Sequence, residues 1–304
     1  MQSQHYVPQI YLRNFCAIPQ EGFLYASRFI DQAEKWTTPR SYHVSNVCCA
    51  EDFYNIDQDT AATNGIQENY IEVFGFQYER FFISEITQKL INRKIDREDI
   101  YKFCRFHLSM KHRNPKFREG YIGKIEENLP SSEEAVREKF LSLGYPLEKI
   151  NLAIELSRKK ILSDPDKEKT HHNRILLENT QGVTPSVLAA FNKLIQYDII
   201  IYEITAPDKF FIITDNPGYS VDLKGETYNV KFQDDYYHVM PMTSKISVIF
   251  HKPENEKDTL KNIRWVTISD KVLDTLNLNC AIFRNDFIYC ENQSYLKDFI
   301  NRLG

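Results

Sequence analysis

The sequence predicts an α+β fold, with a helical bundle in the first two-thirds packed against a mainly antiparallel β-sheet in the last third. Apolar residues recur at helical spacing through residues 65–196, whereas β-branched and aromatic runs dominate residues 197–304. Helices and strands are therefore grouped along the chain, which argues against alternating βαβ units. The 304 residues are enough for one large core, and we expect a single compact unit, 1–304.

Residues 1–64 are predicted to form an irregular region with short strands. Three prolines, at positions 8, 19 and 39, interrupt the segment. The run FLYASRF at 23–29 combines aromatic and small side chains and is expected to be a strand.

The helical part, 65–196, begins with a long apolar periodicity. Residues 66–91 are expected to form one amphipathic helix ending near Asn92, and Asp96 is expected to cap the next helix, which Pro115 stops or restarts. The Ser-Ser-Glu-Glu run at 131–134 predicts a further helix start, and Gly144 its end. Residues 163–174 are polar and aperiodic, so we expect an exposed connection before a helix at about 184–196.

The β-rich part, 197–304, begins with two apolar runs separated by Ala-Pro-Asp, which predicts a β-hairpin over 197–214. Further strands are expected at 229–233, 236–241, 245–250 and 264–268. The end of the chain predicts a short helix at about 270–278, a second hairpin turning at Asn285-Asp286, and a last helix from about Ser294.

Composition restricts the function classes. The net charge of −4 argues against a protein that coats nucleic acid with its whole surface, and no Gly-rich phosphate-binding motif is present. The six cysteines include no C-x-x-C pair, which favours reduced thiols over a zinc site or disulfide framework. No apolar run is long enough for a membrane span, and the first residues do not resemble a signal peptide. We therefore expect a cytoplasmic protein with no membrane partner.

The chain opens with His-Tyr-Val-Pro-Gln at 5–9, followed by Leu-Arg-Asn-Phe at 12–15. These residues resemble the signature that begins a prokaryotic family known as domain of unknown function 4238, and the resemblance extends over nearly the whole chain. Five later features fit in order: Asp52-Phe53-Tyr54, the glutamates Glu72 and Glu79, Arg113-Asn114-Pro115, the run from Phe211 to Pro217, and the strand from Pro241 to Phe250.

This chain departs from the family pattern at two places. Met110 stands where family members often carry Gln, and Thr214 is followed directly by Asp215 where an intervening Ser is expected. The resemblance implies which positions matter, but it implies no activity.

Side chains suited to metal binding recur in these motifs: His5, Glu72, Glu79 and Asp215. Residues seven apart lie within about 20° on one helix face, so Glu72 and Glu79 would share a face about 10 Å apart. An imidazole with carboxylates suits Mg²⁺ or Mn²⁺, which prefer oxygen ligands. The structural alternative has His5 capping a turn, the glutamates pairing with Arg13 or Arg113, and Asp215 making an Asx turn.

A basic segment covers residues 89–118. It holds ten Lys or Arg against three acids, a net +7 in a chain of net −4, with aromatic residues interleaved. This pattern predicts phosphate contacts, whereas the structural alternative is a solvated amphipathic helix. The candidate nucleic-acid-binding side chains are Arg97, Lys102, Arg105, Lys111 and Arg118, and helical spacing aligns Arg97, Tyr101, Arg105 and His112.

Two function hypotheses follow. The first is a metal-dependent nuclease or related phosphodiesterase, with a role in prokaryotic defence as a further hypothesis. Glu72, Glu79 and Asp215 would be metal ligands, His5 a base or ligand, and Arg113 would stabilise phosphate charge. The second is a non-catalytic module that senses a ligand or binds a protein. Whether the chain is an enzyme, and its oligomeric state, stay open at this stage.

Arg113 carries the most specific structural expectation. It ends the basic helix just before Pro115 and lies in a family motif. Because a guanidinium binds a carboxylate bidentately, we expect Arg113 to pair with Glu72, Glu79 or Asp215 and to join the helical part to the β-rich part.

Overall fold

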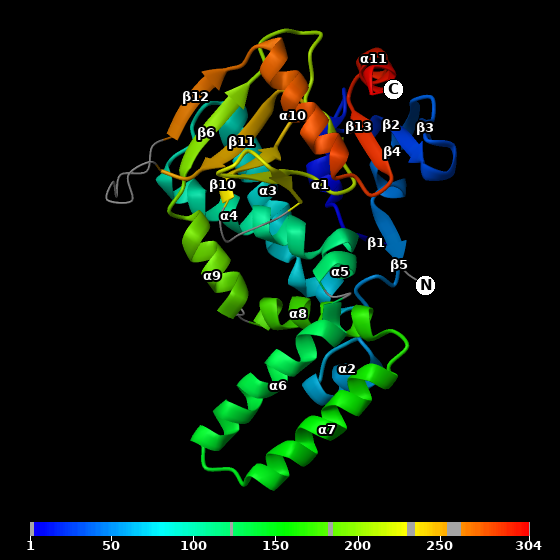
Figure 1. Cartoon of the computed structure of the whole chain (residues 1–304). Helices are drawn as coiled ribbons and strands as arrows, with labels where there is room; N and C mark the ends of the chain where they lie inside the picture. Colours follow the sequence, from blue (N-terminus) through cyan, green and yellow to red (C-terminus); the bar gives the residue numbers. More distant parts are fainter. Residues whose placement is uncertain (1–2, 122–123, 182–184, 230–234, 254–262, 304) are drawn as a thin grey trace.

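The computed structural model describes residues 3–121, 124–181, 185–229, 235–253 and 263–303. It confirms the α+β class, with most helices in the first two-thirds and antiparallel-rich sheets toward the C-terminus (Figure 1). None of the helices in these ranges combines the length and apolar character needed to cross a bilayer.

The N-terminal region contributes short helices and strands to the body. Strand β1 pairs with β5 in a two-stranded sheet, and the strand expected at 23–29 is β2. The elements are β1 (Ser3–His5), α1 (Gln9–Leu12), β2 (Phe23–Ile30), β3 (Lys35–Trp36), β4 (Arg40–His43), β5 (Cys49–Glu51) and α2 (Gln58–Asn64), with 3₁₀ turns η1 (Arg13–Phe15), η2 (Asp31–Ala33) and η3 (Val44–Asn46).

The helical part follows. Its elements are the π-helical turn η4 (Ile71–Gly75), α3 (Gln77–Ile91), α4 (Arg97–His112), α5 (Pro115–Tyr121), α6 (Ile125–Ser142), α7 (Leu147–Ser163), α8 (Lys167–Gln181) and α9 (Pro185–Leu194). Asp96 caps α4 through a capping box with Asp99, and Pro115 opens α5, as the sequence predicts. In Figure 1, α6 and α7 extend away from the rest of the chain as a helical hairpin.

Three expectations about the helices are wrong. The helix expected at 66–91 breaks at Phe76, because residues 71–75 form a π turn that contains a glycine. Helix α6 starts at Ile125 rather than near Ser131, and it contains Pro130. Most of the segment 163–174, expected to be an exposed connection, belongs to α8. His172 and Asn173 are buried there and hydrogen-bonded to backbone carbonyls, and because they are polar, the segment has no apolar periodicity that would predict a helix.

The C-terminal part builds a six-stranded sheet in the order β12-β6-β11-β10-β8-β9, antiparallel except for β12 against β6. Its elements are β6 (Asp198–Glu203), β8 (Tyr219–Asp222), β9 (Thr227–Tyr228), β10 (Asp235–Pro241), β11 (Ile246–His251) and β12 (Ile263–Thr267). Most of the strand expected at 229–233 lies outside the described residues.

A second sheet joins the two ends of the chain. β13 (Phe287–Cys290) lies between β2 and β7 (Ile213–Thr214), and β3 and β4 pair with β2. The hairpin expected over 197–214 is therefore wrong, because β6 and β7 belong to different sheets. The second expected hairpin is also wrong, since α10 (Asp270–Ile282) fills its first arm, while α11 (Gln293–Arg302) matches the expected last helix.

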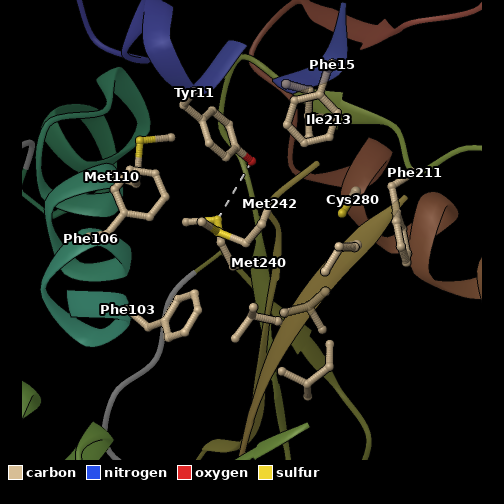
Figure 2. Packing of buried hydrophobic residues seen from close by; sticks show 14 of the residues in the cluster. Tyr11, Phe15, Phe103, Phe106, Met110, Phe211, Ile213, Met240, Met242 and Cys280 are labelled. Carbon is tan, nitrogen blue, oxygen red and sulfur yellow. Dashed lines mark hydrogen bonds between the residues drawn. The ribbon is translucent and has the colours of Figure 1, made fainter. Parts of the chain in front are cut away.

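The main core lies between α4, α1 and the six-stranded sheet. Figure 2 shows Phe103, Phe106 and Met110 of α4 facing the sheet, with Tyr11 between them and Met240. The Tyr11 hydroxyl donates a hydrogen bond of 2.5 Å to the carbonyl of Pro241. This packing fixes the C-terminal end of α4, where the candidate site residues lie.

Candidate functional site

Arg113 lies in a buried polar cluster at the C-terminal end of α4. Its guanidinium donates to the carboxylate of Glu79, to the carbonyl oxygen of His5 and, at 3.3 Å, to the hydroxyl of Tyr54. The aromatic ring of Phe76 covers the guanidinium, with its centroid 3.8 Å from Cζ. The residue as a whole is 2% exposed, so these groups replace water as the partners of its guanidinium. Arg113 pairs with a glutamate as expected.

The two family glutamates lie on either side of the helix break. Glu72 belongs to the π turn and Glu79 to the first turn of α3, so they are not on one continuous helix. Both oxygens of Glu79 are engaged, one by Arg113 and one by the hydroxyl of Ser109. Burial raises the pKa of Glu72, which the nearby Arg113 opposes. Among the described residues, Glu72 Oε2 and His5 Nε2 have no hydrogen-bond partner.

Asp215 performs a separate structural task. Its carboxylate accepts hydrogen bonds from the backbone N–H groups of Asn285 (2.7 Å), Asp286 (2.8 Å) and Phe287 (3.0 Å). The side chain is 1% exposed, and burial raises its pKa to about 6 although the three N–H groups oppose this shift. Asp215 therefore fixes the turn that leads into β13.

The junction between α4 and the β-rich part is formed by residues other than Arg113. The Asn114 side chain donates to the carbonyl of Asp215 (2.8 Å), and Lys111 Nζ donates to the carbonyl of Gly218 (2.6 Å). The expectation that Arg113 joins these two parts is wrong, because its partners lie at residues 5–79; the adjacent asparagine makes that contact.

Lys111 is a buried lysine whose bonded partners are amide and carbonyl oxygens. Besides Gly218, its ammonium contacts the side-chain oxygens of Asn229 (3.0 Å) and Asn216 (3.4 Å). Burial lowers the pKa of Lys111 to about 7. Gly218 approaches the sheet so closely that a Cβ would lie 2.5 Å from the carbonyl oxygen of Val239.

A pocket of about 230 Å³ lies beside this cluster, between η4, α4, α8 and α9. Its polar groups include Arg105, Ser109 and His112, and burial lowers the pKa of His112 to about 4. Tyr101, Arg105 and His112, which helical spacing places on one side of α4, therefore form one wall of this pocket. The lining residues are Gly75, Phe76, Tyr101, Arg105, Leu108, Ser109, His112, Leu176, Asn179, Val187, Leu188 and Phe191.

The side chains predicted to bind Mg²⁺ or Mn²⁺, Glu72, Glu79 and Asp215, do not form a common ligand set. Glu79 is bound by Arg113 and Ser109, and Asp215 by three backbone N–H groups. In the part of the chain that the structure describes, no group of three or more His, Cys, Asp or Glu is arranged to hold a metal ion. These residues do not fit such an ion in this conformation.

The predicted nucleic-acid-binding residues are dispersed. Arg97 is exposed, Arg105 lines the pocket, and Lys102 forms an ion pair with Glu85. One assignment needs correction: Lys111 is buried, and its ammonium is not positioned to bind a phosphate. Arg118 is half-buried, with its guanidinium 3.7 Å from the ring centroid of Phe53.

Several residues of the cluster are absent from the predicted site. Tyr54, Asn114 and Asn216 lie inside the motifs quoted above, so their motif position was the available signal. Ser109 and Phe76 carry no local signal, because their roles depend on the packing of α4 against the helix break.

Comparison with known proteins places the chain in one family. No curated protein and no solved structure matches it. Residues 3–294, nearly the whole chain, match the family described as "Protein of unknown function (DUF4238)". All residues of the buried cluster and the pocket lie within this range. The chain belongs to the DUF4238 family.

Proposed function

We propose that this chain is a ligand-sensing module whose binding site is the pocket between η4, α4, α8 and α9. One observation carries the proposal: two pocket residues, Ser109 and Phe76, directly contact the buried pair of Glu79 and Arg113. A molecule in the pocket would touch the groups that hold this ion pair in place.

The pocket chemistry favours a small, largely apolar molecule with one anionic group. Most of its wall is apolar, and the lining residues named above include a cation, Arg105, but no carboxylate. His112 is neutral near pH 7 because its pKa is about 4. A volume of about 230 Å³ is small for a ligand pocket, which suits one or two aromatic rings. A small aromatic carboxylate meets these requirements.

The path by which binding is sensed runs to the N-terminal segment. Ser109 donates to Glu79, Glu79 accepts from Arg113, and Arg113 donates to the carbonyl of His5 in β1. Since β1 pairs with β5, a change at Ser109 reaches a sheet outside the helical part. A ligand shifts the equilibrium between two conformations of these residues only if it binds one conformation more tightly than the other.

Thermal unfolding with benzoate and indole-3-carboxylate tests the binding site. A bound carboxylate stabilises the native state, by about 2.7 kcal/mol at a hundredfold excess over the dissociation constant. We expect stabilisation by at least one carboxylate, less by benzamide or indole, and little in Arg105→Met or Leu188→Trp. Arg97→Met, an exposed cation on the same helix, is the matched control. Equal responses of Arg105→Met and Arg97→Met would contradict the proposal.

Metal-dependent phosphodiester hydrolysis is the competing proposal. The observation that favours it is that Glu72 Oε2 and His5 Nε2, both from family motifs, are among the buried side-chain atoms of the described residues that have no hydrogen-bond partner. It requires Glu79 to leave Arg113, or Asp215 to leave its turn. DNA, RNA and transfer RNA incubated with Mg²⁺ or Mn²⁺ test it: cleavage by the wild type that Glu72→Gln abolishes would favour the nuclease over the sensor.

A further inference from the structure

The hairpin of α6 and α7 buries very little of its own surface. The two fully described helices hold 18 and 17 residues, and only Ile125, Ile150 and Ile154 among them are buried. Helices of this length gain most of their stability in water from packing an apolar face. The hairpin therefore has more apolar surface than this chain covers.

Exposed apolar side chains are concentrated on this hairpin. Of the 23 large apolar residues that are exposed in the described part of the chain, nine lie between positions 136 and 162. They are Val136, Phe140, Leu141, Leu143, Tyr145, Leu147, Leu152, Leu156 and Leu162. Three of the nine, Val136, Phe140 and Tyr145, line one groove between the helices. Exposed apolar side chains that lie together on a surface mark interaction sites in soluble proteins.

A groove of about 850 Å³ runs along the hairpin to α8. Val136 and Phe140 of α6 face it from one side, and Ile150, Ile154 and Ile161 of α7 from the other. The groove is partly open to solvent. In Figure 1, α6 and α7 run side by side away from α8 and are joined at their far end. This geometry suits helices as occupants.

The charges of the two helices identify the partner. Helix α6 carries five glutamates against one Arg and one Lys, a net −3, whereas α7 carries four Lys or Arg against two glutamates, a net +2. Within the chain, Arg158 of α7 already pairs with Glu133 of α6, with Nε 2.7 Å from the carboxylate. In a twofold dimer, each α6 can also lie beside the α7 of the partner.

We propose that the α6–α7 hairpins of two copies of this chain pack groove to groove as an antiparallel four-helix bundle. In this bundle, each helix lies between two helices whose net charge is opposite to its own. The apolar residues of the two grooves form the core of the bundle. The proposal commits to a second copy, because the −3 and +2 helices of one hairpin complement the same two helices of another.

Sedimentation velocity tests the dimer. We expect the wild type to sediment with twice the chain mass of 35.9 kDa. The double variant Val136→Glu/Phe140→Glu should sediment at 35.9 kDa, because its dissociation constant for the dimer should be about 100-fold higher or more. Both side chains are exposed in the monomer, so its fold should survive. Phe81→Glu, at a 73% exposed apolar residue outside the hairpin, is the matched control and should stay dimeric.

Charge reversal tests the pairing of the helices. Glu134→Lys/Glu138→Lys changes α6 from −3 to +1, and Lys159→Glu/Lys160→Glu changes α7 from +2 to −2. Each variant alone should dissociate, and an equimolar mixture should form the heterodimer, because both of its interfaces are again complementary. A wild-type monomer, a dimer that survives the groove substitutions, or an acyl lipid bound to a monomer in native mass spectrometry would overturn the proposal.

Discussion

The ion pair of Arg113 and Glu79 is enclosed by the fold: the two side chains are 3% and 4% exposed. One carboxylate oxygen of Glu79 binds Arg113 and the other binds the pocket residue Ser109. This pair therefore connects the N-terminal segment, the helix break and the proposed ligand pocket.

Replacing Arg113 should destabilise the protein strongly. Arg113→Ala leaves the Glu79 carboxylate buried and unpaired, which costs about 3–5 kcal/mol. Arg113→Lys keeps the charge but cannot bind Glu79, Tyr54 and the His5 carbonyl together, so we expect an intermediate loss. Urea unfolding measures both values. Arg137→Ala, which breaks the more exposed pair with Glu134, should cost at most about 1 kcal/mol; an equal cost at both positions would contradict this account.

Gly218 should tolerate no side chain. It has φ +77°, and a Cβ there would lie 2.5 Å from the carbonyl oxygen of Val239. Gly65 provides a matched control, because it has φ +64° with nothing within 4 Å of a Cβ. Both alanine variants carry the left-handed backbone cost of about 1 kcal/mol, but Gly218→Ala should lose about 1–3 kcal/mol more. Similar unfolding free energies for the two variants would refute the close approach.

Lys111 should make stability rise with pH just above neutrality. Its pKa is lowered from 10.5 to about 7, so above pH 7 the unfolded chain binds a proton that the folded chain has released. The free energy of unfolding therefore gains a positive slope between about pH 7 and pH 8.5, below the range where cysteines ionise. In Lys111→Met this contribution to the slope should vanish. An unchanged slope would show that Lys111 stays protonated in the folded protein.

The sequence predicts best those elements whose ends are set by local chemistry. The limits of α4 follow from the Asp96 capping box and from Pro115, and both appear as expected. The partner of β7 could not be inferred in this way. The run Phe210–Ile213 is buried throughout and has no alternation that assigns it to one sheet.

The site was predictable only in part for the same reason. The pairing of Arg113 with a glutamate follows from the cost of burying a charge, so it could be expected from the motif. The pocket is formed by four elements from residues 75–191, and only its α4 wall had a sequence pattern. The sequence predicts Asp215 as a metal ligand because its carboxylate offers the oxygen atoms that Mg²⁺ prefers, but backbone N–H groups of the neighbouring turn are its partners in the fold.

Hydrogen exchange of the N-terminal segment tests the central claim, that the pocket is coupled to β1 through Ser109, Glu79 and Arg113. Exchange of peptides covering residues 3–12 is measured with and without saturating indole-3-carboxylate. The control is Ser84→Ala, whose hydroxyl donates a hydrogen bond within α3 to the Arg80 carbonyl.

We predict that the carboxylate slows exchange at residues 3–12 in the wild type and in Ser84→Ala. In Ser109→Ala the carboxylate should still bind, as measured by calorimetry, but exchange at residues 3–12 should not respond, because the bond to Glu79 is lost. Binding without any effect on residues 3–12 in the wild type, or an undiminished effect in Ser109→Ala, would contradict the account.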